Sequence, residues 1–217
     1  MELTPTELSP AERYRLLIGG IVPRPIAFVS TVDADDRLNL APFSFFNGVG
    51  SNPMTVMFCP ANQPDGSDKD TLRNALPIDE GGVGEFVINV ASASYINRVA
   101  AAAEELDFGE SEFDLTGLTP VASQVVRPPR VAESPVAFEC RTTHVIRTNP
   151  GSPGGGNVVL GEVVHVFIRD DLINERFHID PAALDAVGRM GGLGYATTRD
   201  RFDLPRGTAA LEQNPAT

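Results

Sequence analysis

The chain has 217 residues, of which 42% are hydrophobic and 21% charged, a balance typical of a globular protein with one larger domain or two small ones. Its formal net charge of −12 and its lack of clustered basic residues argue against a nucleic-acid-binding surface, since phosphate neutralisation requires grouped Lys and Arg side chains. No segment reaches the apolar length of a membrane helix, and the first residues are acidic and polar, unlike a signal peptide, so we expect a cytoplasmic protein without membrane contact.

The first helix is predicted from its capping residues. Ser9 is placed to be the N-cap, Pro10 occupies the first helical position and Glu12 completes a capping box. We therefore expect a helix from Pro10 to Ile18 that ends at Gly19-Gly20.

An apolar hairpin follows this helix. Pro25 to Val32 is rich in β-forming residues, Asp33 to Arg37 is a polar turn, and Asn39 to Asn47 returns through an aromatic and hydroxyl-rich segment. The return arm should be a poor strand, because Pro42 cannot donate a hydrogen bond to a ladder. Its backbone is then free to bond a planar, polar ligand.

The remaining elements are mostly strands. Two more helices are expected, from Lys69 to Leu76 with Ser67 or Asp68 as the cap, and from Tyr95 to Leu106 with Ser92 or Ser94 as the cap. With about six strands, three helices and no βαβ alternation, the pattern predicts an antiparallel barrel with peripheral helices in a single domain over residues 1–205, followed by a flexible tail over 206–217. The further strands are Met54 to Cys59, Glu85 to Val90, Val136 to Thr148 and Val158 to Ile168.

Several common functional signatures are absent from the sequence. No GxGxxG motif follows a strand, and neither GxxxxGK[ST] nor GxSxG occurs, which argues against a Rossmann site, a P-loop and a serine hydrolase. The two cysteines, Cys59 and Cys140, lie in apolar runs without CxxC spacing, so we interpret both as reduced core thiols. The histidines are interpreted as structural or surface residues, and no metal ligand is assigned; they are His144, His165 and His178.

Lys69 is the single lysine of the chain, and every other basic side chain is an arginine. It stands at a predicted helix start beside the Thr71 hydroxyl, which together supply the groups that bind a phosphate monoester. A capped surface helix with one lysine is also commonplace, so this pattern alone leaves both interpretations open. The polar side chains of the return arm, which are Asn39, Ser44 and Asn47, are suited to the planar end of the same ligand.

A set of short motifs extends over nearly the whole chain. They are Arg24-Pro25-Ile26-Ala27, Ser30-Thr31, the segment NLAPFSFFN from Asn39 to Asn47, Pro53, Lys69-Asp70-Thr71, Asn74, FVINV from Phe86 to Val90, GEVV from Gly161 to Val164, GRMGG from Gly188 to Gly192, and Tyr195. In combination, above all through APFSFFN and KDT, the chain resembles the flavin-reductase-like proteins of the FMN-binding split-barrel superfamily, in the branch that includes flavoredoxin. The resemblance implies an antiparallel split β-barrel of Greek-key type.

The resemblance also implies a homodimer with FMN at the subunit interface. The FMN phosphate would lie near Lys69 and Thr71, the ring would lie against Ala41 to Asn47, and Arg189 would approach from the late Gly-rich loop. FMN is the expected cofactor, with FAD as the alternative. No catalytic residue is assigned, because the flavin carries the redox chemistry. The expected cofactor-binding residues are Asn39, Ala41, Ser44, Phe45, Phe46, Asn47, Lys69, Asp70, Thr71 and Arg189.

The activity implied by the resemblance is that of an NAD(P)H-dependent FMN reductase-like oxidoreductase. NADH or NADPH would give a hydride to the flavin, and the electrons would pass to free flavin or to a partner monooxygenase. Two alternatives remain. The first alternative is a non-catalytic FMN electron carrier, as in flavoredoxin. The second is a flavin-dependent split-barrel enzyme with another substrate.

One late loop departs from the family pattern. The Gly- and Pro-rich segment Asn149 to Gly156 joins two predicted strands, and Asn157 stands where many relatives carry a histidine associated with flavin or nicotinamide contact. We expect this loop to fold over the open face of the flavin as a lid, with Asn157 as a neutral hydrogen-bonding substitute.

Overall fold

The computed structural model describes residues 1–106 and 110–212, and its centre is a seven-stranded antiparallel sheet. The strands run in the order β2-β1-β5-β8-β9-β4-β3. They are β1 (Ala27–Val32), β2 (Leu38–Phe43), β3 (Phe46–Ser51), β4 (Met54–Phe58), β5 (Glu85–Val90), β8 (Val136–Arg147) and β9 (Asn157–Ile168).

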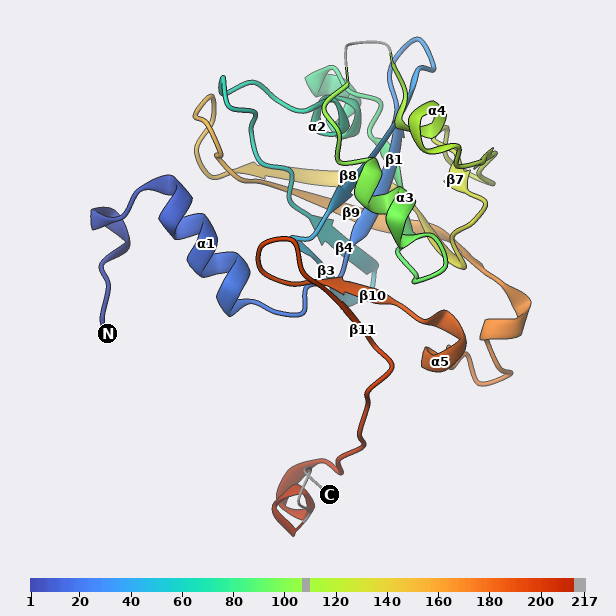
Figure 1. Cartoon of the computed structure of the whole chain (residues 1–217). Helices are drawn as coiled ribbons and strands as arrows, with labels where there is room; N and C mark the ends of the chain where they lie inside the picture. The colour runs from blue at the N-terminus through green and yellow to red at the C-terminus, as the bar shows by residue number, and fades with distance from the viewer. Residues whose placement is uncertain (107–109, 213–217) are drawn as a thin grey trace.

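The two edge strands of this sheet are neighbours in the sequence. β2 ends at Phe43 and β3 begins at Phe46, so two residues join strands that stand at opposite ends of the sheet order. A link this short spans at most about 11 Å, which forces the sheet to curl until its edges meet. The result is an antiparallel barrel that stays open along one seam, and the predicted split-barrel fold is confirmed (Figure 1).

The barrel interior is filled by apolar side chains around Phe58. Its ring centroid lies 5.4 Å from that of Phe43 and 5.1 Å from that of Phe86, and Phe58 and Phe86 are fully buried. A Cβ atom on Gly161 of β9 would come within 2.4 Å of Phe86 Cζ. The glycine that interrupts this β-branched run is therefore required by the phenylalanine opposite it.

Within residues 1–106 and 110–212, five short α-helices and four minor strands accompany the sheet. Tyr95, Val99 and Phe113 pack on the face opposite the barrel interior, in a second apolar cluster with Phe28. No helix among the described residues is long and apolar enough to span a membrane. The elements are α1 (Pro10–Gly20), α2 (Asp70–Ala75), α3 (Ile96–Ala101), α4 (Glu112–Thr116), α5 (Pro181–Leu184), β6 (Pro120–Val121), β7 (Arg130–Val131), β10 (Val187–Arg189) and β11 (Tyr195–Thr197), with 3-10 turns at Pro5–Glu7, Ile78–Glu80, Asp170–Leu172 and Gly207–Glu212.

Helix α1 stands apart from the barrel (Figure 1). Its predicted capping box is confirmed, because Ser9 Oγ accepts from the Glu12 amide and Glu12 Oε2 accepts from the Ser9 amide at 2.9 Å. The helix runs through Gly20, two residues further than predicted, and Ile18 is its one buried residue.

Two local predictions are corrected by the structure, that of the return arm and that of the helix over 95–106. The return arm 39–47 is divided between β2 and β3, and β2 pairs with β1 along its whole length, so it is a regular strand. Pro42 is tolerated because β2 is an edge strand. The predicted helix over 95–106 is shorter, since α3 covers Ile96–Ala101 without a side-chain cap, and the hydroxyls of Ser92 and Ser94 bond each other at 2.9 Å. Of the predicted C-terminal tail, residues 213–217 lie outside the described residues.

Candidate functional site

A cavity of about 330 Å³ lies beside the short link between β2 and β3. Helix α2 forms one wall, and residues around α3 and α4 form another. Seven of the ten residues predicted to bind the cofactor line this cavity: Asn39, Ala41, Ser44, Phe45, Lys69, Asp70 and Thr71. The structure thus brings the two separate sequence motifs, APFSFFN and KDT, into one site.

Lys69, the residue directly before α2, is one of the residues that line the cavity. Its two acidic neighbours are each occupied by an arginine, Asp68 by Arg147 and Asp70 by Arg73. Among the described residues, the half-buried Lys69 ammonium forms no ion pair of its own. Its positive charge is therefore available to an anion that occupies the cavity.

The start of α2 differs from the prediction. Lys69 itself is the N-cap residue, and no side chain makes a capping hydrogen bond. Ser67 Oγ instead donates to Asp65 Oδ1 at 2.6 Å, and the Asp68 carboxylate binds Arg147. The predicted caps, Ser67 and Asp68, are wrong because both side chains have partners that the local sequence does not show.

Asn39 fastens α2 to the sheet. Its side-chain amide donates to Thr71 Oγ1 at 2.8 Å and to Thr31 Oγ1 at 3.0 Å, so it joins β2, β1 and the helix. Thr71 is 1% exposed and Asn74 of the same helix also donates to Thr31 Oγ1. This buried network fixes the wall of the cavity in front of Lys69.

The link between β2 and β3 is held by Arg24. Its Nε donates to Ser44 Oγ at 3.2 Å, and its guanidinium carbon lies 6.0 Å from the centroid of the Phe45 ring. Arg24 is 3% exposed, and this burial lowers its pKa below the ordinary value. The remaining donors bind the main-chain carbonyls of Ile18, Ile21 and Met190 at 2.7, 2.8 and 3.0 Å. Ser44 and Phe45 are consequently held in place at the cavity wall.

Several cavity residues were not anticipated from the sequence, among them the thiol of Cys59 and an acidic group made of Glu104, Glu105, Glu110 and Glu112. Glu112 of α4 accepts a hydrogen bond from the Leu40 amide at 2.8 Å, and burial raises the pKa of its carboxyl. Ser111 and Gly117, which cap α4 at its two ends, signal the helix but not its position against β2. Cys59 lines the cavity and is half-buried rather than part of the core, whereas Cys140 is buried as predicted. Burial raises the pKa of the Cys59 thiol.

Three predicted cofactor residues do not line the cavity of the single chain. Phe46 packs against the barrel core, and exposed Asn47 accepts a hydrogen bond from the Gly48 amide at 2.9 Å. The Arg189 guanidinium carbon lies 4.4 Å from the centroid of the Tyr195 ring, within the β10–β11 hairpin. Their contact with a cofactor stays a prediction.

The expected role of Asn157 is wrong. Its side chain is 1% exposed, and its amide donates to Pro60 O at 3.1 Å and to Asn62 Oδ1 at 2.8 Å. The loop that precedes it lies against residues 61–66, where Asn62 donates to two of its carbonyls. The loop therefore buttresses one wall of the cavity from outside and is not placed as a lid.

Comparisons with known proteins identify a family and several relatives of this chain. The family model described as "Flavin reductase like domain" covers residues 19–194. An uncharacterized protein of Halalkalibacterium halodurans is 40% identical over 99% of both chains. The crystal structure of nitrilotriacetate monooxygenase component B from Bacillus cereus is 33% identical, with a TM-score of 0.86 over 94% of this chain and 98% of that one.

A second solved structure is similar over almost the whole length. The 2-nitrobenzoate 2-nitroreductase NbaA of Pseudomonas fluorescens is 27% identical, with a TM-score of 0.82 over 96% of this chain and 97% of that one. The family match and the split-barrel fold agree with one another. The chain belongs to the flavin reductase like domain family.

Proposed function

We propose that this protein is an oxidoreductase that binds FMN in the cavity between Lys69 and the β2–β3 link, and that NADH or NADPH reduces the flavin there. The observation that carries this proposal is the meeting of Lys69, which forms no ion pair with any described residue, and a polar and aromatic strand link in one cavity. Membership of the flavin reductase like domain family supports it independently. A flavin mononucleotide has both an anionic end and a planar end, and the two sides of this cavity match them.

The residues of the cavity fit such a ligand. A phosphate monoester carries roughly two negative charges at neutral pH, and Lys69 supplies an ammonium beside Asp68 and Asp70, whose carboxylates are each paired with an arginine. Ala41, Ser44 and Phe45 supply a small side chain, a hydroxyl and an aromatic face for a planar ring. The cavity volume of about 330 Å³ lies within the range of small-molecule sites.

The protein's part in the reaction is binding and orientation. Bound FMN would supply the redox chemistry, accepting a hydride from the nicotinamide and passing two electrons to an acceptor. Arg24 holds the Ser44-Phe45 link, and Asn39 holds the start of α2, so the two ends of the ligand would meet rigid walls. We assign no protein acid or base to the transfer.

The similarity to a monooxygenase component suggests the acceptor. Nitrilotriacetate monooxygenase component B of Bacillus cereus is by its name one component of a monooxygenase. We propose that this chain likewise passes electrons to free flavin or to a partner monooxygenase. A second candidate function follows from NbaA, whose name describes direct reduction of a nitroaromatic compound, so this chain would then use reduced flavin on its own organic substrate.

A steady-state assay tests the proposed activity. Purified protein should oxidise NADH or NADPH when FMN is supplied, and the comparison of both nicotinamides with FMN and FAD identifies the preferred pair. Protein that binds FMN and oxidises neither nicotinamide would instead be an electron carrier. Nicotinamide oxidation that requires an added nitroaromatic compound would favour the second candidate.

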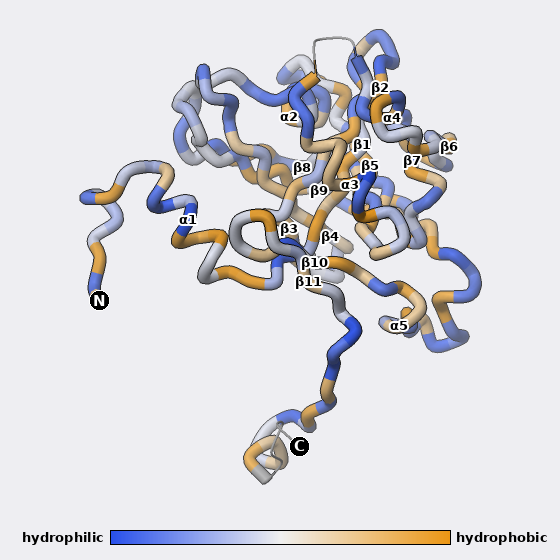
Figure 2. The backbone as a smooth tube through the Cα atoms, viewed as in Figure 1, coloured by the Kyte–Doolittle hydropathy of each residue, from blue (hydrophilic) through white to orange (hydrophobic). Residues whose placement is uncertain are grey.

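We also propose that the protein is a homodimer. Leu16 and Leu17 of helix α1 and the C-cap residue Ile21 are near half exposed, at 51%, 49% and 55%, on an element that stands off the barrel (Figure 2). An apolar surface of this kind on a projecting helix is suited to a second copy of the chain. Phe43, by contrast, is buried in the core and adds nothing to that surface.

The dimer proposal predicts a specific effect of charge on α1. The double variant Leu16→Glu/Leu17→Glu should sediment as a monomer at micromolar concentration, because burying two carboxylates in an apolar interface is costly. Arg15→Glu, at an exposed position on the other side of the same helix, serves as the matched control and should leave the dimer intact. Wild-type protein that sediments as a stable monomer would contradict the proposal.

A further inference from the structure

We propose that Arg147, which lies outside the cavity, is a positioning residue that holds Lys69 at the anion end of the flavin site through Asp68. The inference rests on the proposed FMN function and extends it to the end of strand β8. Arg147 is the last residue of β8, and Asp68 directly precedes Lys69 in the chain. The clamp and the lysine are therefore one peptide unit apart.

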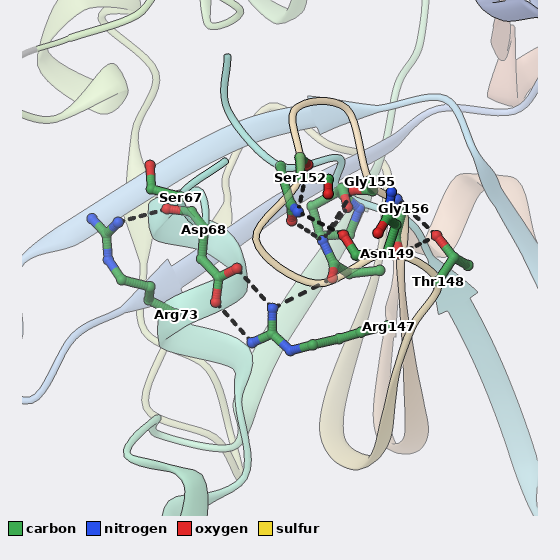
Figure 3. A network of polar contacts seen from close by, with 12 residues as sticks. Ser67, Asp68, Arg73, Arg147, Thr148, Asn149, Ser152, Gly155 and Gly156 are labelled. Atoms are coloured by element: carbon green, nitrogen blue, oxygen red, sulfur yellow. Dashed lines mark hydrogen bonds and ion pairs between the residues drawn. The ribbon is translucent and has the colours of Figure 1, made fainter. Parts of the chain in front are cut away.

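The contact between Asp68 and Arg147 is a two-point clamp. Arg147 Nη1 and Nη2 donate to Asp68 Oδ1 and Oδ2, both at 2.7 Å (Figure 3). Such a fork fixes orientation as well as distance, because two parallel bonds leave little rotational freedom. The side chains are 27% and 22% exposed, so the pair is partly shielded from solvent. The bond to Arg147 lowers the pKa of the Asp68 carboxyl and keeps it ionised.

The main chain at Asp68 is held from a second side. Arg73 Nη1 donates to the Asp68 carbonyl at 2.6 Å (Figure 3). Arg147 Nη1 also lies 3.4 Å from Asn157 Oδ1. Residue 68 thus has its carboxylate and its carbonyl bound by different arginines. Lys69 follows with an extended backbone, φ −67° and ψ 154°, and contributes no side-chain capping bond of its own.

The hairpin loop between β8 and β9 stabilises the same segment further upstream. Asn157 bonds Pro60 O and Asn62 Oδ1, and Asn62 Nδ2 donates to Asn149 O and Ser152 O at 3.3 and 2.9 Å. The segment from 60 to 69, which contributes cavity-lining residues, is therefore fixed to the β8–β9 hairpin at both of its ends. Arg147 is the charged member of this attachment, and its partner Asp68 directly precedes Lys69 in the chain.

Because Arg147 acts through Lys69, its loss should affect a ligand only through the phosphate. Riboflavin has the ring and ribityl chain of FMN without the phosphate, so it reports on the remainder of the site. In Arg147→Met, the dissociation constant for FMN should rise roughly five- to tenfold, while that for riboflavin stays at the wild-type value. Fluorescence titration of each flavin with purified protein measures both constants.

Two further variants separate positioning from a general structural role. Arg141→Met removes another arginine of β8, which is exposed and pairs with Glu85 at 3.5 Å, and should leave both flavin constants unchanged. In a Lys69→Ala background, Arg147→Met should cause no additional loss of FMN affinity, since the group that it positions is absent.

Three results would overturn the inference. They are an equal loss of FMN and riboflavin affinity in Arg147→Met, an unchanged FMN constant in that variant, and additive effects of Arg147→Met and Lys69→Ala. Wild-type protein that binds no FMN, or that binds it independently of Lys69, would overturn the proposed function itself and this inference with it. The two failures are thus distinguished by the wild-type and Lys69→Ala titrations.

Discussion

Lys69→Ala should weaken FMN binding by roughly 10- to 100-fold, the largest loss that we expect from any single change in the cavity. A charge-assisted hydrogen bond contributes about 1.5–3 kcal/mol, and no other lysine exists in the chain to replace the lost ammonium. The fold should persist, because Lys69 is half-buried and makes no side-chain capping bond in α2. Isothermal or fluorescence titration with FMN measures the effect.

Lys69→Arg is the matched control for this prediction. It retains the positive charge, so most of the FMN affinity should return, while riboflavin binding should be the same in all three proteins. Equal FMN affinity in wild type and Lys69→Ala would contradict the proposed position of the FMN phosphate beside Lys69.

Phe58→Ala should lower the free energy of unfolding by about 3–5 kcal/mol. Phe58 is fully buried, and its ring contacts those of Phe43 and Phe86 in the centre of the barrel, so truncation leaves an unfilled cavity. Because Phe43 also lines the candidate flavin cavity, flavin affinity should fall as well. Chemical denaturation at a fixed protein concentration measures the loss of stability.

Phe202→Ala provides the comparison for Phe58. The Phe202 side chain is 69% exposed, so its removal should change the free energy of unfolding by no more than about 0.5 kcal/mol. A similar destabilisation in both variants would mean that the barrel interior is not the main source of stability.

The sequence predicts those parts of the fold that depend on local signals. The capping box of α1 is made by residues three positions apart. The long β-branched and apolar runs of β8 and β9 are typical of strands. The end of α2 before Pro77 was likewise predicted, since proline cannot continue a helix.

The division between β2 and β3 has no comparable local signal. Ser44 and Phe45 are polar and aromatic like the residues on either side of them, so the sequence predicts one continuous arm. The break arises because the sheet curls and its two edges meet, with Phe45 O accepting from the Cys59 amide at 2.8 Å. Closure of the barrel, a long-range effect, overrides the local pattern.

The candidate site shows the same limit. Its two motifs were found from residue type, but the groups that support them come from distant parts of the chain. Glu112 binds the amide of Leu40 across 72 positions, and Arg147 binds Asp68 across 79. Local propensity predicts Asp68 as a helix cap, but its carboxylate binds a remote arginine instead. A sequence pattern within one helix does not contain this information.

The structure of the protein in complex with FMN tests the central claim most directly. We expect the phosphate within hydrogen-bond distance, about 2.7–3.2 Å, of Lys69 Nζ, with the ring against Ala41, Ser44 and Phe45. An FMN phosphate bound away from Lys69, or a ring bound outside this cavity, would contradict the account.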